Sequence, residues 1–397
     1  MTTTHSPNPS VATPLPFIRS ELASLQAYTP HPGGTEGQSV AISIDRVDTN
    51  ENPYDLPLEL KQKLAQMWVE AIESNRYPDG GHQRLKAEIA AYVTESAGLS
   101  VGAAAGNEDG ILPSQISVGN GSDELLRSIL IATCVGGAGS ILVAAPTFSM
   151  YGILAQTLGI PVVSIDRTAN FEVDVTAAQT AISDRQAAPI RVVFMVHPNS
   201  PTGNALSATE LDWMRGLPTD ILVVIDEAYF EFSQQTVVAE LASHPNWIVL
   251  RTFSKAFRLA AHRVGYAVGH PQLIATLEQV RLPYNLPSIS LAAAELVLQH
   301  RLALLAVLPE ITNERDRLFV ALSKFDALKV WRSDANFLYV RMLGVENAEL
   351  AMAQLVAKLK IHGTSIRHTG GGLRISIGSP AENDRTIARI GDLLGSF

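Results

Sequence analysis

Six short apolar runs, separated by stretches with helical spacing, constrain the fold of this chain more than any other feature. The runs are nearly continuous in apolar residues and rich in β-branched side chains, which is typical of strands buried on both faces of a parallel sheet. They are Gln115–Gly119, Ser140–Ala145, Pro161–Ile165, Arg191–His197, Ile221–Asp226 and Trp247–Arg251. Helical stretches such as Ser122–Val135 and Ala208–Leu217 lie between them. The alternation predicts a large α/β domain whose ligands bind at the carboxyl ends of the strands.

The pattern changes after Pro287, where strands and helices no longer alternate in the same way. One long helix is expected from Ser290 to about Phe325, followed by three strands and a further helix. The strands are Leu328–Arg332, Phe337–Met342 and Leu373–Gly378, and the helix is Ala348–Leu359. This region therefore resembles a second, smaller α+β domain.

The expected organisation has three parts. Residues 1–16 are polar, rich in proline and free of Arg and Lys, so we interpret them as a flexible N-terminal extension and not as a signal or transit peptide. Residues 50–287 form the large domain, and residues 17–49 and 288–397 form the small domain. Ala103–Gly110, rich in small residues, is expected to be a surface loop.

A long uncharged run raises the alternative of a membrane span. No Asp, Glu, Lys, Arg or His occurs from Ser128 to Ile165, which is long enough to cross a bilayer. Glycine and proline residues, however, divide the run into pieces that suit helix, strand, helix and strand in turn. We therefore interpret it as part of the buried α/β core.

Charge and cysteine content exclude several classes of function. The chain has 30 Lys and Arg against 39 Asp and Glu, a net charge of −9, which disfavours nucleic acids and anionic membranes as partners. Its only cysteine, Cys134, cannot form an internal disulfide, so we expect a reducing, cytoplasmic location. The histidines have no recognisable metal-ligand spacing, and no metal is expected.

Polar and aromatic residues follow the predicted strands where ligands should bind. Ser122 follows two glycines and begins a helix, whose N-terminus could bind phosphate or could simply be capped. Phe148 follows the next strand and could equally be a core residue. Asp226 ends a buried strand, where a carboxylate is costly without a positive partner. Lys255 and Arg263 follow the last of the six strands.

One cofactor would use all of these positions. Pyridoxal phosphate needs a lysine for its Schiff base, a carboxylate at the pyridinium nitrogen, an aromatic side chain over the ring and a phosphate cup. Lys255, Asp226 and Phe148 match the first three requirements, Tyr229 offers a hydroxyl to the ring oxygen, and the cup is assigned to Ser122, Ser254 and Arg263. A dinucleotide is disfavoured because the third glycine of its fingerprint is missing.

The chain resembles a known family, the fold-type-I pyridoxal-phosphate aminotransferases of classes I and II, over roughly residues 21 to 391. Within it, the motifs are most similar to the histidinol-phosphate aminotransferase subfamily. The most specific matches are Thr252–Phe257, Ala335–Phe337 and Leu373–Ser376, with Asn75–Gly80 and Gly119–Glu124 in support. The resemblance implies a mostly parallel seven-stranded sheet and a homodimer with shared active sites.

The resemblance also implies a role for each matching residue. Lys255 would bond the cofactor and move the substrate proton, and Asp226 and Tyr229 would contact the ring nitrogen and ring oxygen. Cofactor contacts are further implied for Ser122, Asp123, Phe148, Asn199, Ser200, Ser254, Arg263 and, from the partner subunit, Tyr77. Substrate contacts are implied for Arg374, which would bind a carboxylate or phosphate, and for Tyr28, Asn336 and Arg385.

Two residues depart from the family pattern. Members usually have tyrosine at the position of Phe148, so ring stacking would survive without a hydroxyl contact. They usually have asparagine at the position of Ser200, directly before Pro201-Thr202-Gly203. The contact to the ring oxygen could therefore come from Ser200, from Asn199 or only from Tyr229.

The implied reaction is amino transfer from L-glutamate to imidazole-acetol phosphate in histidine biosynthesis. An aromatic aminotransferase and a threonine-phosphate decarboxylase use the same machinery and remain as alternatives. A non-catalytic pyridoxal-phosphate sensor is disfavoured, because the sequence before Tyr28 is too short for a DNA-binding head and the chain is acidic.

Overall fold

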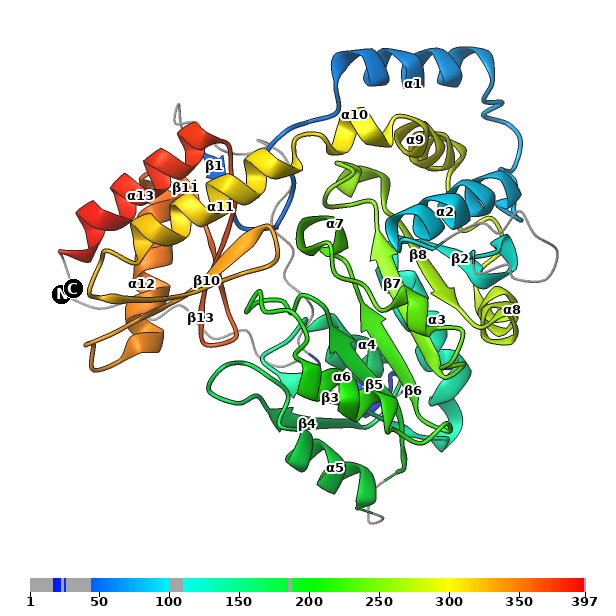
Figure 1. The fold of residues 1–397 in the computed structure, drawn as a ribbon, viewed down its shortest axis with the longest axis horizontal. Coiled ribbons are helices and arrows are strands. Elements are labelled where there is room, and N and C mark those ends of the chain that lie inside the picture. Colours follow the sequence, from blue (N-terminus) through cyan, green and yellow to red (C-terminus); the bar gives the residue numbers. More distant parts are fainter. Residues whose placement is uncertain (1–16, 23–24, 26–43, 100–109, 185–187, 396–397) are drawn as a thin grey trace.

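The computed structural model describes residues 17–22, 25, 44–99, 110–184 and 188–395 (Figure 1). The proposed extension at residues 1–16, Tyr28 and nearly all of the loop predicted at 103–110 lie outside the described residues. The chain folds into a large part built on a seven-stranded sheet and a smaller part built on a four-stranded sheet.

The large sheet has the strand order β2-β8-β7-β6-β5-β3-β4, and its core strands are parallel. The bounds are β2 Ile116–Asn120, β3 Ser140–Ala145, β4 Val162–Asp166, β5 Ile190–Val196, β6 Leu222–Asp226, β7 Trp247–Thr252 and β8 Val264–Gly269. The six apolar runs and the mostly parallel seven-stranded sheet are thus confirmed.

Strand β8 is the member of the sheet that the apolar pattern does not reveal. It pairs antiparallel with both β2 and β7, and it begins and ends with glycine-containing steps that lower strand propensity. Gly265 is required there because a Cβ at this position would lie 2.6 Å from the backbone nitrogen of Ser122. The glycine that hides the strand also lets a helix N-terminus approach the sheet.

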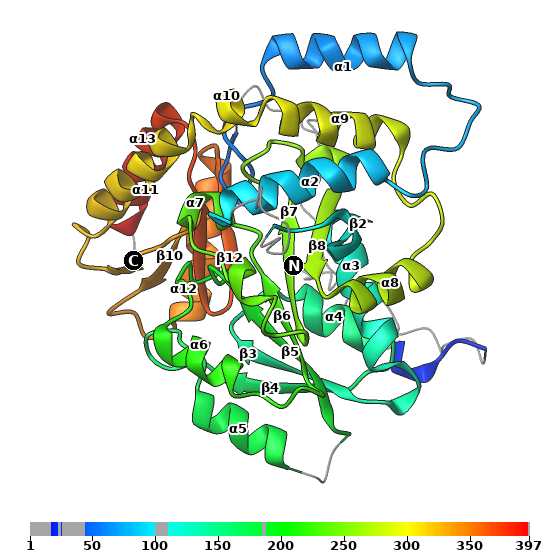
Figure 2. The same ribbon diagram turned by 45° about the vertical axis from the view of Figure 1, so that its right-hand side comes forward.

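Helices cover both faces of the large sheet (Figures 1 and 2). On one face lie α3 Gly121–Thr133, α4 Met150–Thr157 and α8 Pro271–Val280; on the other lie α2 Gln83–Ser96, α5 Val175–Ser183, α6 Ala208–Arg215 and α9 Ser288–Gln299. Helix α1 Leu58–Glu70 packs on α9, and the short α7 spans Phe230–Ser233.

The uncharged run from Ser128 to Ile165 contributes the end of α3, strand β3, helix α4 and most of β4, as predicted. Among the described residues, no single helix has both the length and the apolar character needed to cross a bilayer. One pair, Ser288–Gln299 and Arg301–Leu322, meets both requirements only when taken together across a bend of 79°.

The single long helix predicted from Ser290 to Phe325 is wrong. The structure has three helices in its place, α9, α10 Arg301–Leu305 and α11 Leu308–Leu322. His300 leaves the helical region after α9, and Pro309 occupies the first turn of α11, where proline is tolerated. Each break therefore has a local cause that the apolar pattern alone does not reveal.

The break also moves the boundary between the two parts. The buried residues of α9 pack in the same apolar cluster as α2 and the large sheet, whereas those of α11 pack in the cluster of the small part. We therefore propose a boundary between α10 and α11, instead of the one expected after residue 287.

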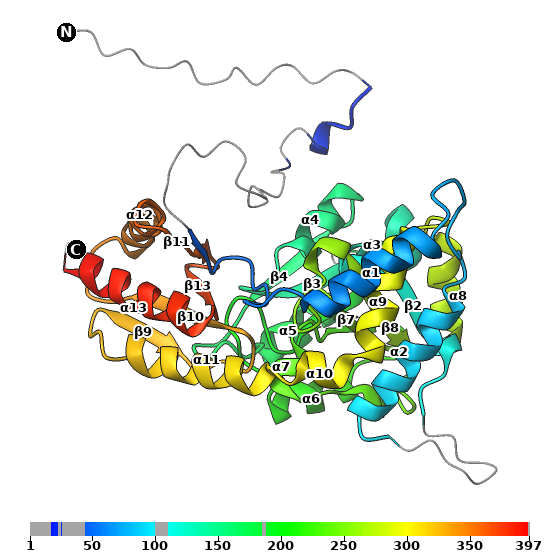
Figure 3. The ribbon, with the colours of Figure 1, turned by 90° about the horizontal axis from the view of Figure 1, so that it is seen from above.

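The small part contains an antiparallel sheet in the order β12-β13-β10-β9. Its elements are β9 Leu328–Trp331, β10 Phe337–Met342, β12 Arg367–Thr369, β13 Gly372–Ser376, α11, α12 Ala348–Ile361 and α13 Pro380–Leu394. It lies beside one end of the large part (Figure 3). Helix α13 was not predicted, although Ser379, Pro380 and Glu382 form a recognisable helix start.

An early segment of the chain belongs to the small part. Strand β1, Asp45–Arg46, pairs in parallel with β11, Thr364–Ser365, and residues 47–57 then cross to the large part and reach α1. This crossing segment, residues 47–57, can be followed in Figure 1 from β1 to the start of α1.

Candidate active site

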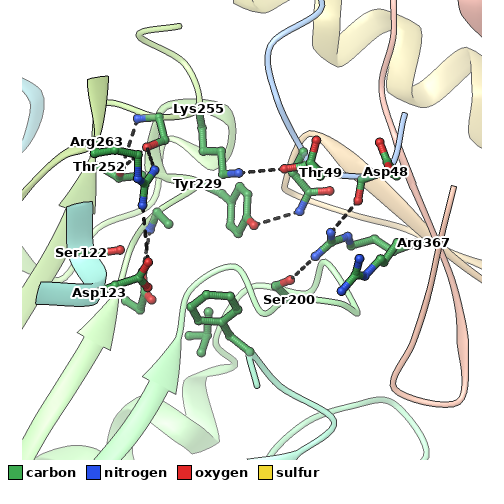
Figure 4. A pocket seen from close by; sticks show the side chains of 17 residues that line it. Asp48, Thr49, Ser122, Asp123, Ser200, Tyr229, Thr252, Lys255, Arg263 and Arg367 are labelled. Atoms are coloured by element: carbon green, nitrogen blue, oxygen red, sulfur yellow. Dashed lines mark hydrogen bonds and ion pairs between the residues drawn. The ribbon is translucent and has the colours of Figure 1, made fainter. Parts of the chain in front are cut away.

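A pocket lies where the carboxyl ends of β5, β6 and β7, the start of α3 and the small part meet (Figure 4). This is the edge of the sheet where a parallel α/β fold is expected to bind its ligands. The residues that line the pocket are Asp48, Thr49, Asn50, Ser122, Asp123, Phe148, Val196, Ser200, Asp226, Ala228, Tyr229, Thr252, Ser254, Lys255, Arg263, Arg367 and Arg374.

Asp226 ends β6 inside the pocket and is buried. One carboxylate oxygen, Oδ1, accepts the backbone N–H of Ala228 at 3.1 Å, and Oδ2 accepts the hydroxyl of Tyr151 at 2.6 Å. Burial raises the pKa of Asp226 to about 6. Among the described residues, no Lys, Arg or His forms an ion pair with it, so this carboxylate is suited to a positively charged ligand atom.

Lys255 reaches into the pocket from the loop after β7 (Figure 4). Its Nζ donates a hydrogen bond to the carbonyl oxygen of Thr49 at 3.0 Å. Burial and, next, the positive charge of Arg374 lower the pKa of Lys255 from 10.5 to about 8. A substantial fraction of the amine is therefore neutral, and nucleophilic, near physiological pH.

The N-terminus of α3 forms one wall of the pocket. Gly121 has a φ of +70° there, and a Cβ on it would lie 2.6 Å from the guanidinium of Arg263. Arg263 pairs with Asp123 at 3.4 Å and donates to the hydroxyl of Ser254 at 3.3 Å. Free helix N–H groups, hydroxyls and a guanidinium thus converge, which is the chemistry of a phosphate site.

Phe148 gives the pocket an aromatic face, and two further aromatic side chains pack behind it. The ring of Phe148 lines the pocket and meets the ring of Tyr151 edge-on, with centroids 5.5 Å apart. Tyr151 in turn stacks on Phe194 of β5 at 4.4 Å. Phe148 is therefore held in place by aromatic packing beneath it.

The crossing segment, residues 47–57, contributes a polar edge. Tyr229, after β6, accepts a hydrogen bond on its hydroxyl from Nδ2 of Asn50 at 2.9 Å. Asn50 has a φ of +55°, a conformation that asparagine tolerates better than most residues. Burial raises the pKa of Tyr229, so its hydroxyl stays protonated and able to donate into the pocket.

Two arginines from the small part face the same cavity. Arg374 on β13 donates to the hydroxyl of Ser200 at 3.1 Å and to the carbonyl oxygen of Asp48 at 2.9 Å. Arg367 on β12 lines the pocket beside it, as Figure 4 shows. The two guanidinium groups make this end of the pocket suitable for anionic substrates.

Asn199 does not reach the pocket, in contrast to its predicted cofactor contact. Its Oδ1 accepts from Thr147 and Arg167, and its Nδ2 donates to Thr202 and to the carbonyl oxygen of Pro146. With its amide fully occupied inside the turn, Asn199 has no group left for a ligand. Ser200, the next residue, is the one that lines the pocket.

Arg167 joins the two loops that carry Phe148 and Ser200. Its buried guanidinium donates to the carbonyl oxygens of Ala144 at 3.0 Å, Pro146 at 3.1 Å and Phe171 at 2.8 Å, and to Oδ1 of Asn199 at 3.1 Å. Because one buried guanidinium makes all four hydrogen bonds, it holds both loops in one arrangement.

Arg167→Ala is expected to lower the free energy of unfolding by about 3–5 kcal/mol, because it removes four hydrogen bonds of a buried guanidinium that also lies 3.9 Å from the buried carboxylate of Glu210. Urea denaturation followed by circular dichroism measures the change. Arg191→Ala is the matched control, since its partner Asp220 is exposed, and it should cost less than about 1 kcal/mol. Equal losses for the two variants would contradict the joining role of Arg167.

Three further predicted residues lie outside the pocket lining, and Tyr28 lies outside the described residues. Asn336 is buried behind the pocket and donates to the carbonyl oxygen of Asn50 at 3.0 Å. Arg385, on α13, forms a bidentate pair with Asp45, so its guanidinium is engaged away from the cavity. Tyr77 is 80% exposed and stacks on Tyr284 at 4.5 Å.

The pocket includes residues that the sequence patterns did not reveal. Asp48, Thr49 and Asn50 lie in an irregular segment, and Arg367 lies on a three-residue strand, so neither periodicity nor strand-end position singles them out. The nearest sequence signal is Asn52-Pro53, which the family resemblance also covers and which begins two residues after Asn50. Within the described part of the chain, no cluster of His, Cys, Asp and Glu could hold a metal ion.

The chain matches a family model described as aminotransferase class I and II over residues 46–390. It is 58% identical over 385 residues to histidinol-phosphate aminotransferase of Trichodesmium erythraeum, covering 94% of this chain and 98% of that protein. It is 59% identical to histidinol-phosphate aminotransferase 2 of a Nostoc species, covering 95% and 97%.

A solved structure shares the fold. The crystal structure of histidinol-phosphate aminotransferase from Sinorhizobium meliloti, in complex with pyridoxal 5′-phosphate, superposes with a TM-score of 0.78 at 23% identity. The match covers 97% of this chain and 99% of that one.

Proposed function

This chain belongs to the class I and II aminotransferases, and on that premise we propose that it transfers the amino group of L-glutamate to imidazole-acetol phosphate. The products are 2-oxoglutarate and L-histidinol phosphate, and the reaction is a step of histidine biosynthesis. Relatives at 58–59% identity over nearly the whole chain carry this name. The observation that carries the proposal is a buried carboxylate, Asp226, which pairs with no cation of the described residues and lies in the same pocket as Lys255 with its lowered pKa.

The pocket fits pyridoxal phosphate as its cofactor. When bound, this group supplies an electron-poor ring that makes the Cα proton of an attached amino acid more acidic. Asp226 offers a buried negative charge to the ring nitrogen, and Phe148 offers an aromatic face. The cradle at Gly121 and Gly265, which a Cβ on either residue would fill, suits the phosphate.

We assign the remaining contacts from the side chains that line the pocket. Ser122, Ser254 and Arg263, with the first turn of α3, would hold the phosphate; Asp123 orients Arg263 through their ion pair. Tyr229 would donate to the ring oxygen, because Asn50 occupies its acceptor side. Ser200 is the second hydroxyl near that oxygen.

Lys255 would carry the proton that leaves the substrate Cα. Its Nζ, when neutral, would hold the cofactor through a covalent bond formed with loss of water. Once the substrate amine has replaced it, the free Nζ would take a proton from the substrate Cα and return it to the cofactor. The hydrogen bond to Thr49 keeps Nζ directed across the pocket, where a proton carrier must lie. Burial of the surrounding side chains excludes water from this transfer.

The lowered pKa of Lys255 predicts a pH dependence. Below about pH 8 the protonated amine predominates, so capture of pyridoxal phosphate by the cofactor-free protein should accelerate about tenfold per pH unit and level off above pH 8. Stopped-flow absorbance between pH 6 and 10 measures the rate. A rate that keeps rising to pH 10 would indicate an unperturbed lysine and contradict the expected environment.

The two arginines would bind the anionic groups of both substrates. Glutamate carries two carboxylates, and the keto substrate carries a phosphate, so a pocket with Arg374 and Arg367 can accept either. Arg374 is anchored by Ser200 and Asp48, which favours it for the group next to the reacting carbon. Arg367 would bind the second anion.

Arg367→Ala is therefore expected to raise KM for its anionic substrates about 10-fold to 100-fold while kcat changes less, because a charge-assisted hydrogen bond is lost. Steady-state kinetics with glutamate and with imidazole-acetol phosphate measure the effect. Arg341→Ala is the control, since that arginine packs on the aromatic rings of Phe171 and Trp331 outside the pocket lining. Unchanged KM values in Arg367→Ala would contradict the assignment.

We also propose that the enzyme is a homodimer with shared active sites. Large side chains are exposed on α1 and on the loops that follow α1 and α8: Trp68, Val69, Tyr77, Leu282 and Tyr284. Exposed apolar surface of this kind is typical of a protein interface. Sedimentation velocity should give twice the mass of 42.7 kDa.

The single buried cysteine supports a cytoplasmic location.

Single turnovers separate the proposed reaction from its alternatives. The cofactor is first aminated with glutamate, and imidazole-acetol phosphate should then discharge it roughly 100-fold faster than phenylpyruvate. An equal or faster reaction with phenylpyruvate would identify an aromatic aminotransferase. Release of carbon dioxide from threonine phosphate would identify a decarboxylase.

A further inference from the structure

Tyr151 is a buried polar residue with no role in the proposed reaction so far. It lies in the first turn of α4 and is 0% exposed. Its ring is fixed on both sides, by stacking on Phe194 and by the edge contact with Phe148. The ring therefore cannot turn away, and its hydroxyl has one fixed direction.

The hydroxyl of Tyr151 points at the carboxylate of Asp226. The hydroxyl of Tyr151 lies 2.6 Å from Oδ2, at the short end of the range for such bonds. Burial raises the pKa of Tyr151 well above 10, and the nearby Asp226 carboxylate raises it further. The tyrosine is therefore always the donor, and Asp226 the acceptor.

Asp226 needs this donor because its other surroundings oppose its negative charge. Burial raises its pKa, and the carboxylates of Asp123 on α3 and Glu227 beside it raise it further. Among the described residues, Tyr151 and the N–H of Ala228 are the groups that lower this pKa. Of these two donors, only Tyr151 comes from a different element of the fold.

We propose that Tyr151 is a positioning residue that fixes the orientation and the negative charge of Asp226 beneath the cofactor ring. It acts through Asp226 and does not itself line the pocket. Tyr151 also packs against Phe148, the aromatic side chain that would lie on the cofactor ring. Asp226 and Phe148, the two residues assigned to the ring, are therefore both held by Tyr151. This inference rests on the proposed function, since it concerns the group that Asp226 would pair with.

Tyr151→Phe keeps the aromatic packing and removes only the donor. A hydrogen bond to a charged group is worth about one to two pH units in the pKa of its acceptor. Asp226 should therefore protonate at higher pH, and the loss of pyridoxal-phosphate affinity on the acid side should begin about one to two pH units higher. The turnover number should fall about 10-fold to 100-fold, with little change in KM for glutamate.

Tyr92→Phe is the matched control. Tyr92 on α2 is also buried and also donates to a buried carboxylate, Oε1 of Glu231 at 3.0 Å, but neither residue lines the pocket. Both variants lose one tyrosine-to-carboxylate hydrogen bond in the same part of the molecule. A merely structural role of Tyr151 would therefore make the two variants alike.

The direct measurement is the ¹⁵N resonance of the pyridine nitrogen in enzyme loaded with labelled pyridoxal phosphate. Wild type and Tyr92→Phe should show the protonated nitrogen, and Tyr151→Phe should shift toward the neutral one. Cofactor affinity is measured in parallel from pH 5.5 to 8.5. A resonance and a pH profile of Tyr151→Phe that match the control would overturn the inference.

A second variant covers the case in which Tyr151→Phe does not fold. Tyr151→3-fluorotyrosine keeps the shape and gives a stronger donor, so the acid-side loss of affinity should move to lower pH; no movement would overturn the inference. A wild-type protein that neither binds pyridoxal phosphate nor reacts with glutamate would instead refute the proposed function. The two failures are therefore distinguishable.

Discussion

Lys255→Ala is expected to abolish transamination, lowering kcat by about 10⁴-fold or more, because one side chain supplies both the amine and the proton carrier. The pocket offers no substitute among its described residues, since Arg263, Arg367 and Arg374 are its other basic side chains and guanidinium groups stay protonated. Single-turnover experiments with glutamate, followed at the cofactor absorbance, measure the loss in each half-reaction.

Two comparison variants separate chemistry from folding. Lys255→Arg keeps a positive charge in the pocket but cannot provide a neutral amine, so it should be as inactive as Lys255→Ala. Lys86→Met removes another buried lysine of the large part, whose partner Glu278 retains Arg281, and should lose stability while keeping turnover. Ordinary amino exchange by Lys255→Ala would refute the assignment of Lys255.

Asp226→Asn should lower kcat by about 10²-fold to 10³-fold, the usual range for removing one group that stabilises developing charge. The amide has the shape of the carboxylate but cannot balance a protonated ring nitrogen. Because Asp226 is buried and has no cation partner among the described residues, removing its charge should not weaken folding. The Tm should therefore stay equal or rise while activity falls.

Asp220→Asn provides the control for this variant. Asp220 directly precedes the strand that Asp226 ends, but its side chain is exposed and pairs with Arg191 at the opposite edge of the sheet. The control should show unchanged kcat and cofactor affinity. If Asp226→Asn instead lowers the Tm, and unfolding alone explains the lost activity, the carboxylate is structural.

Much of the site could be predicted because its residues follow strands with strong local signals. Asp226 ends one β-branched apolar run and Lys255 lies in the loop after another, and the parallel alternation places all such ends at one edge of the sheet. Motif resemblance added Arg374 and Ser200, which no spacing rule would select. The predictions of Asp226 and Lys255 as pocket residues needed only local sequence and the topology of the sheet.

The remainder depends on contacts that local sequence does not encode. Asn199 stands in the expected turn, but its amide is used by Arg167 from a different loop. Asn50 and Arg367 reach the pocket only through the packing of the small part against the large one. Strand β8 was hidden by Gly265, whose lack of a side chain is required by tertiary contact.

The crossing segment, residues 47–57, also bears on how the protein is made. Asn50 bonds to Ser376 across 326 positions of the chain, and Asp48 bonds to Arg374 across the same distance. During synthesis, Asp48 and Asn50 leave the ribosome long before their partners, so these hydrogen bonds form only after Arg374 and Ser376 have emerged. The nascent large part can bury its sheet earlier, but the substrate end of the pocket is completed only after Arg367 and Arg374 have been synthesised.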